Sequence, residues 1–172
     1  KAMFIRKKIL SIQTIFLLIA FLTLGSLVHA KSDSTEKRPN FLIILADDLG
    51  YSDLSSFGSE ISTPGIDSLA ENGVKFANFH VTATCSPTRS VLMTGVDNHL
   101  TGLGNMRIIM SDNQFGRPGY EGELNQRVET ISTILQRNGY RTYMAGKWHL
   151  GMEEFNLPVN RGFDKSFTLM ET

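Results

Sequence analysis

The single cysteine of the chain, Cys85, lies in the segment ATCSPTRSVLMTG (83–95). A lone cysteine cannot form an intrachain disulfide, so it is a packing residue, a link to another chain, a metal ligand or a reactive group. Pro87 suits the first turn of a helix that Gly95 ends, which places Cys85 where helix N–H groups favour anions. Arg89 follows four residues later on the same face and can bind an oxyanion through two N–H groups. An inert buried thiol is the common alternative.

A pair of adjacent carboxylates follows an apolar run. Asp47 and Asp48 stand near the end of NFLIILADDLG (40–50). Neighbouring carboxylates are hard oxygen ligands, which suit Ca²⁺ or Mg²⁺ and not a soft metal. Paired aspartates after a strand are also frequent in turns and helix caps. The pair therefore indicates a candidate cation site, with a structural turn as the alternative.

A lysine and a histidine stand near the end of a second apolar run, YRTYMAGKWHLG (140–151). On a strand, the period of two would place Lys147 and His149 on one face and Trp148 on the other. A cation beside a titratable imidazole suits an anionic substrate whose leaving group needs a proton. A Lys-x-His pair on the surface, without a role in chemistry, is the alternative.

The elements that position these residues alternate between strands and helices. Buried strands are predicted at 40–50 and 140–151, and an alternating strand at 74–81. Helices are predicted after Thr63-Pro64 (64–73), at 87–95 and at 123–139, with an irregular stretch at 96–122. This order predicts an α/β fold with a mainly parallel sheet. Since ligand crevices lie outside the carboxyl ends of such strands, we expect the aspartate pair and the Lys147/His149 pair to face one site.

Composition and charge limit the class of protein. The 172 residues are 41% hydrophobic, which is ordinary for a globular protein. Basic and acidic residues number 17 each, but all charges of residues 1–30 are basic, so residues 31–172 carry 13 basic and 17 acidic residues. A nucleic-acid groove is therefore not expected.

The N-terminus is typical of an export signal. A positive region at Arg6–Lys8 precedes an uncharged apolar stretch, and VHA (28–30) offers small residues for cleavage. The stretch of 22 uncharged residues from Ile9 to Ala30 also suits a signal anchor. We expect a signal peptide at 1–30, a flexible polar linker at 31–39, and a periplasmic or secreted protein exported by the cell's translocation machinery.

Four segments, taken together and in order, resemble the sulfatase family. CSPTR (85–89) is similar to its Cys/Ser-x-Pro-x-Arg signature, and PNFLIILADDLGYSDLSSFG to its N-terminal metal-binding strand. GYRTYMAGKWHLG is similar to its second signature, and RGFDKSF (161–167) to a stretch that follows. The likeness covers residues 38–168 and is greatest to bacterial arylsulfatases. It implies an alkaline-phosphatase-like fold, a mainly parallel sheet flanked by helices, of which residues 40–172 would form an incomplete N-terminal part.

The resemblance also implies roles for the residues singled out above. A maturation enzyme would oxidise Cys85 to formylglycine, and Asp47, Asp48 and the modified residue 85 would ligate Ca²⁺. Arg89 would stabilise the hydrated aldehyde and help to hold the metal site. Lys147 would contact the sulfate oxygens. His149 would hydrogen-bond the formylglycine hydroxyl and assist elimination.

Such an enzyme would cleave sulfate monoesters of small molecules or glycans. One hydroxyl of the hydrated aldehyde attacks sulfur and displaces the alcohol or phenol. Deprotonation of the other returns the adduct to the aldehyde and expels sulfate, which divides one hard step into two easier ones. The family's later histidine, lysine and Asp-Asn residues find no counterpart in these residues, so a truncated, non-catalytic product is one alternative. A phosphonate monoester or phosphodiester hydrolase with the same nucleophile is another.

Overall fold

The computed structural model describes residues 37–171, so the predicted signal peptide (1–30) and most of the predicted linker (31–39) lie outside the described residues. Residues up to Leu45 and residues from Ala46 onward form separate units, and each is described by itself. In the first, residues 37–45 are exposed and contain no helix or strand. The prediction of a buried strand at 40–50 is therefore wrong for this structure. An apolar run becomes a strand only through hydrogen bonds to a neighbouring strand, and the two described strands, Tyr143–Lys147 and Lys165–Leu169, pair with each other.

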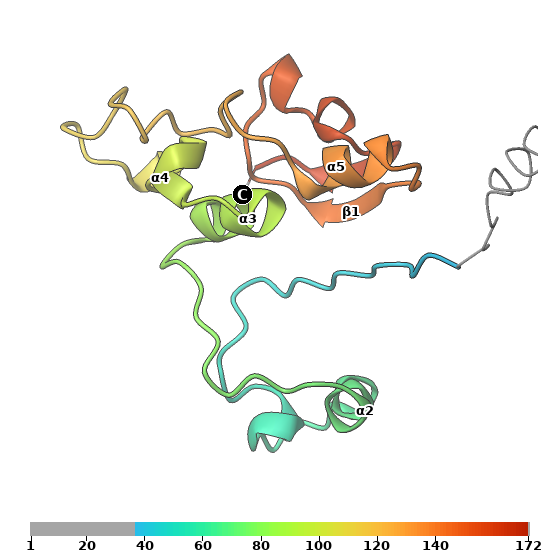
Figure 1. The fold of residues 1–172 in the computed structure, drawn as a ribbon. Coiled ribbons are helices and arrows are strands. Elements are labelled where there is room, and N and C mark those ends of the chain that lie inside the picture. Colours follow the sequence, from blue (N-terminus) through green and yellow to red (C-terminus); the bar gives the residue numbers. More distant parts are fainter. Residues whose placement is uncertain (1–36, 172) are drawn as a thin grey trace, which may run out of the picture. The chain divides into compact units, whose positions relative to one another are not determined.

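The second unit combines short helices with a parallel pair of strands, which confirms the predicted α/β class (Figure 1). In β1 (Tyr143–Lys147) and β2 (Lys165–Leu169), Tyr143 pairs with Lys165 and Lys147 with Leu169. Its helices are α2 (Pro64–Asn72), α3 (Cys85–Thr94), α4 (Asn98–Thr101) and α5 (Ile131–Arg137). Single 3₁₀ turns lie at Ser55–Phe57, Arg107–Ile109, Glu154–Asn156 and Pro158–Arg161. Among the described residues, no helix is both long enough and apolar enough to cross a membrane.

Two helices begin and end close to where the sequence predicts. Thr63 precedes Pro64 at the start of α2, and Gly73 follows its last residue. α3 begins at Cys85, two residues before Pro87, and ends at Gly95, whose φ of 67° is left-handed. Glycine adopts this conformation without the steric cost that a Cβ atom brings. α3 and α4 lie side by side (Figure 1).

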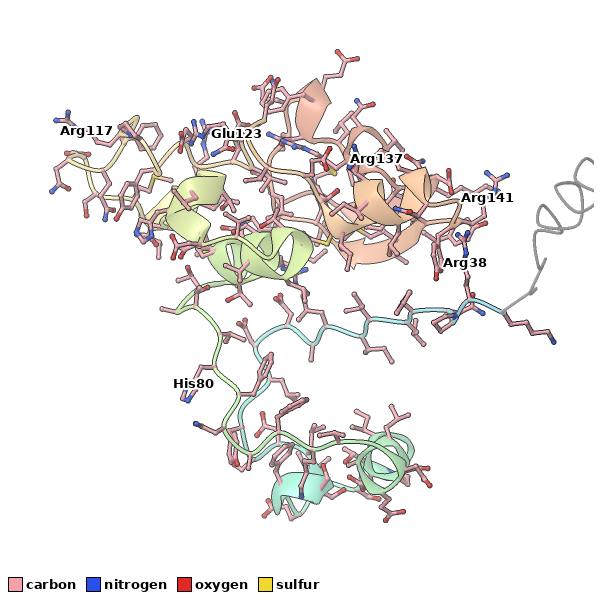
Figure 2. The ribbon with its side chains drawn as sticks, viewed as in Figure 1. Arg38, His80, Arg117, Glu123, Arg137 and Arg141 are labelled. Atoms are coloured by element: carbon pink, nitrogen blue, oxygen red, sulfur yellow. The ribbon has the colours of Figure 1, made fainter. Side chains whose placement is uncertain are left out.

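Other predicted elements are shorter or absent. Residues 74–81 contain no strand and are exposed, and the side chain of His80 projects from this segment (Figure 2). The helix predicted at 123–139 is reduced to α5, and residues 123–130 are irregular chain in which the backbone N–H groups of Leu124 and Asn125 bond to the carbonyls of Leu150 and Thr101. The strand predicted at 140–151 is reduced to β1 and is largely exposed. The irregular stretch at 96–122 includes α4 and the turn at 107–109.

The core of this unit surrounds the only tryptophan of the sequence, Trp148. Its indole is 1% exposed, donates a hydrogen bond to the carbonyl of Asn156 at 2.8 Å, and packs edge-on against Phe163. The fully buried neighbours are Leu103, Leu124 and Leu150. Because Trp148 stands between Lys147 and His149, its burial fixes the end of β1 within the unit.

Candidate functional site

Cys85 is the first residue of α3, as predicted, and its side chain is half-buried. The residues that follow it in the first two turns, Ser86, Pro87, Arg89 and Ser90, are buried. The thiol therefore sits at the start of a helix whose next two residues, Ser86 and Pro87, are packed into the protein. Free N–H groups of a helix N-terminus favour negative charge close to this position.

Arg89 connects three parts of the chain. It extends from α3, is 8% exposed, and donates one hydrogen bond to the carboxylate of Asp47 at 3.0 Å and another to the backbone carbonyl of Lys147 at 2.6 Å. The planar guanidinium can make both bonds at once because its N–H groups diverge in one plane. Arg89 thereby holds the aspartate pair and the end of β1 beside α3.

The second oxygen of the Asp47 carboxylate accepts a hydrogen bond from Lys147 Nζ at 2.9 Å. The hydrogen bonds from Lys147 and then Arg89 hold the pKa of Asp47 below its ordinary value of 3.8. Asp48, next in sequence, has a left-handed φ of 56°. One ligand atom each of Asp47, Asp48 and Cys85 lie within 4.8 Å of one another.

His149 lies just beyond β1 and is 8% exposed. Its φ of 57° is left-handed, so the strand period that would place it on the same face as Lys147 does not apply. Burial, followed by the charges of Lys147 and Arg89, lowers the pKa of His149 from its ordinary value of 6.5. The imidazole is therefore neutral at neutral pH. Its Nδ1 is buried without a hydrogen-bond partner among the described residues.

The ligand atoms of Asp47, Asp48 and Cys85 suit a hard cation only in part. The carboxylates of Asp47 and Asp48 are ligands of the type that Ca²⁺ prefers, whereas the Cys85 thiol is soft. An oxygen in place of that sulfur would make all three groups hard ligands. Ca²⁺ usually takes about 6–8 oxygen ligands, so these residues would supply only part of its shell.

Sequence reasoning missed a threonine network that precedes the cysteine. Thr88 Oγ1 lies 2.6 Å from Thr82 Oγ1 and 2.9 Å from the carbonyl oxygen of Thr84. A threonine near the start of a helix can bond to the backbone carbonyl four residues back, so Thr88 itself was the available signal.

Comparisons with known proteins all point to the same family. Residues 39–172 match the family model described as Sulfatase. The chain is 55% identical over 137 residues to an uncharacterized sulfatase of Schizosaccharomyces pombe, covering 78% of this chain and 25% of that protein. It is 42% identical over 135 residues to an arylsulfatase of Klebsiella aerogenes, covering 78% of this chain and 29% of that protein.

A solved structure extends the likeness to the backbone. The PsFucS1 sulfatase from Pseudoalteromonas sp. superposes with a TM-score of 0.60 at 31% identity, covering 74% of this chain and 25% of that chain. The chain thus spans about a quarter of the length of the relatives that it matches. Its partial α/β arrangement corresponds to the alkaline-phosphatase-like fold of these neighbours. The match over residues 39–172 shows that the chain belongs to the sulfatase family.

Proposed function

We propose that the protein hydrolyses sulfate esters, aryl sulfates among them, at the site that contains Asp47, Asp48 and Cys85. The observation that carries this proposal is the approach of their ligand atoms to within 4.8 Å of one another, with Arg89 and Lys147 bonded to the Asp47 carboxylate. This arrangement combines a nucleophile, carboxylates and two cations that suit an anionic ester. The similarity to the Klebsiella arylsulfatase supports the substrate class.

Cys85 is the proposed source of the nucleophile, after a maturation enzyme has oxidised it to formylglycine. When hydrated, formylglycine supplies one hydroxyl that attacks sulfur and displaces the alcohol or phenol, and a second whose deprotonation expels sulfate and restores the aldehyde. The position of Cys85 supports this, since the side chain is half-buried and not sealed in the core. Helix N–H groups nearby would stabilise negative charge as it develops.

Asp47, Asp48 and the modified residue 85 would hold Ca²⁺, which when bound supplies positive charge beside the sulfuryl oxygens. Arg89 would orient the nucleophile and hold Asp47 in place, and Lys147 would bind a sulfate oxygen. His149, neutral at neutral pH because its pKa is lowered, would hydrogen-bond a hydroxyl of residue 85 and accept its proton.

The decisive experiment begins with the mass of the tryptic peptide that spans Cys85, from protein produced in a host with the maturation enzyme. Formylglycine is expected, as a loss of mass relative to cysteine. Cys85→Ala should abolish hydrolysis of an aryl sulfate because it removes the attacking group. An unmodified thiol, or near-wild-type turnover in Cys85→Ala, would refute the assigned nucleophile.

A second assay separates the reaction classes. A sulfatase should turn over an aryl sulfate faster than a phosphonate monoester or a phosphodiester with the same leaving group. The reverse order would favour the related phosphonate or phosphodiester hydrolase. Absence of turnover with all three, in protein that carries formylglycine, would favour a non-catalytic product.

We also propose that the protein acts outside the cytoplasm, after export and cleavage following Ala30. The basic and apolar pattern of residues 1–30 supports this. N-terminal sequencing of protein recovered from the cell exterior or periplasm should begin at Lys31. Protein that remains in the cytoplasm with residues 1–30 attached would contradict export.

A further inference from the structure

The backbone that leads into Cys85 is held by two threonine hydroxyls. Thr88 Oγ1 lies 2.6 Å from Thr82 Oγ1, 2.9 Å from the carbonyl oxygen of Thr84 and 3.1 Å from that of Thr82. Thr82 Oγ1 also lies 3.3 Å from the Thr84 carbonyl oxygen. These contacts tie residues 82–84 to the second turn of α3. Both hydroxyls are partly buried, so water competes less for their hydrogen bonds.

α3 has no side-chain cap at its N-terminus. Thr84 is the N-cap residue of α3, with φ −140° and ψ 163°, yet its side chain makes no capping hydrogen bond. Its carbonyl accepts the first backbone hydrogen bond of the helix, from the Thr88 N–H at 3.2 Å, and in addition the hydrogen bond of the Thr88 hydroxyl at 2.9 Å. The peptide group between Thr84 and Cys85 is therefore fixed from inside the helix, one turn away.

The two sides of Cys85 are restrained differently. After it, Ser86 is 1% exposed and Pro87 is also buried, so packing holds the chain. Before it, Thr82 and Thr84 are only partly buried and Ala83 is exposed, so packing is weaker. The threonine network is the restraint on that side.

We propose that Thr88 is a positioning residue for the nucleophile: its hydroxyl fixes the Thr84 carbonyl and thereby the direction in which residue 85 points toward Asp47 and Asp48. This inference rests on the proposed function, since it assigns Thr88 a part in the same site. Thr88 does not contact the reacting atoms. Its effect is on the orientation of residue 85, to which rates of attack are sensitive.

The test compares Thr88→Val, which keeps the shape and removes the hydroxyl, with Thr88→Ser, which keeps the hydroxyl. Formylglycine content is measured first by mass spectrometry, and kcat is expressed per converted molecule. Because a displacement of about 1 Å can cost roughly 100-fold in rate, Thr88→Val should lower kcat by roughly 10- to 100-fold. KM should change by less than about threefold, since the loss concerns the transition state. Thr88→Ser should restore kcat.

Thr94→Val is the matched control. Thr94 Oγ1 donates to the carbonyl of Ser90 at 2.7 Å and accepts from the Val96 N–H at 3.2 Å, so the variant also loses a hydroxyl–carbonyl hydrogen bond, at the other end of α3. Its kcat per converted molecule should remain that of the wild type. An equal fall in Thr94→Val and Thr88→Val would show a general effect of helix stability and overturn the proposal.

The remaining outcomes are also decisive. Wild-type protein without formylglycine or turnover would overturn the proposed function and this inference with it. Active wild type together with a fully active Thr88→Val would overturn this inference alone. If Thr88→Val does not fold, Thr88→Ala removes the same hydroxyl and leaves no methyl group against the oxygens of Thr82 and Thr84. A fall in its kcat would support the proposal, and wild-type kcat would overturn it.

Discussion

The carboxylate of Asp47 contacts two cations at once. One oxygen accepts from Arg89 at 3.0 Å and the other from Lys147 at 2.9 Å, while Asp48 follows directly in sequence. Two carboxylates close together repel each other, and these cations offset that repulsion. The site is thus electrostatically balanced by its own side chains, and Asp47 is ionised at all ordinary pH values because its pKa is lowered.

The pKa of the His149 imidazole can be tested directly. Burial lowers its pKa from the ordinary value of 6.5, and the charges of Lys147 and Arg89 lower it further. An NMR titration of the folded protein should therefore give a midpoint below 6.5, with the signal assigned by its loss in His149→Gln. Lys147→Met removes one repulsive charge, so it should move the midpoint upward.

The same shift has a consequence for stability. As pH falls below 6.5, the unfolded chain binds a proton at residue 149 that the folded chain does not, so the free energy of unfolding decreases until the lowered pKa is reached. His149→Gln should reduce this decrease. A titration midpoint at or above 6.5 would contradict the burial of an uncharged imidazole.

At the scale of elements, the turn before β2 packs against α5 through a glycine. Gly162 has a left-handed φ of 88°, and a Cβ atom there would overlap the backbone of Thr133. The carbonyl of the preceding residue, Arg161, accepts hydrogen bonds from the hydroxyls of Thr130 and Ser132. Both contacts bring the turn close to the start of α5.

Gly162→Ala should therefore be strongly destabilising, by about 3 kcal/mol or more, because backbone cannot move aside cheaply. Gly116→Ala is the control, since Gly116 also has a left-handed φ, of 70°, but a methyl group added there would meet no atom within 4 Å. That variant should lose only about 1 kcal/mol from strain. Urea denaturation measures both. Equal losses would show that the close approach to α5 does not matter.

Local signals predicted helix ends well and strand lengths poorly. Pro64, Gly73 and Gly95 act through their own backbone preferences, so they locate the ends of α2 and α3 from sequence. A strand forms only with a partner strand, which can lie far along the chain. The apolar runs at 40–50 and 74–81 gave no information about such a partner strand. Thr130, the N-cap of α5, was not foreseen although its side chain accepts a local hydrogen bond from the Thr133 N–H, because the amphipathic pattern at 123–139 continues through it.

The residue types of the candidate site could be recognised in the sequence, whereas their arrangement in space could not. Residue type alone singled out Asp47, Cys85, Arg89 and Lys147, which hydrogen bonds and ligand distances bring together. The sequence could not predict that Arg89 and Lys147 both bond to the Asp47 carboxylate. Asp47 lies 42 positions from Arg89 and 100 positions from Lys147. The left-handed backbone of His149 was also unforeseen, because histidine rarely adopts it.

At the scale of the whole molecule, the proposed cation should couple to stability. A ligand that binds only the folded state raises the free energy of unfolding by RT ln(1 + [L]/Kd), about 2.7 kcal/mol at 100 times Kd. Added Ca²⁺ should therefore raise the thermal midpoint of the protein, and a chelator should reverse the change. Asp48→Asn should weaken the response, because it replaces one of the two carboxylates near Cys85 with a neutral group.

The stabilisation by Ca²⁺ should also depend on whether residue 85 is a cysteine thiol or formylglycine. A hard cation prefers oxygen to sulfur, so protein that carries formylglycine should gain more stability from Ca²⁺ than protein that keeps the Cys85 thiol. Asp112→Asn, which alters an exposed carboxylate in the 96–122 stretch, controls for the loss of one negative charge and should respond as the wild type does. An equal Ca²⁺ response in Asp48→Asn and Asp112→Asn would place the cation elsewhere. Equal responses of the thiol and formylglycine forms would exclude residue 85 as a ligand while leaving the two aspartates in place.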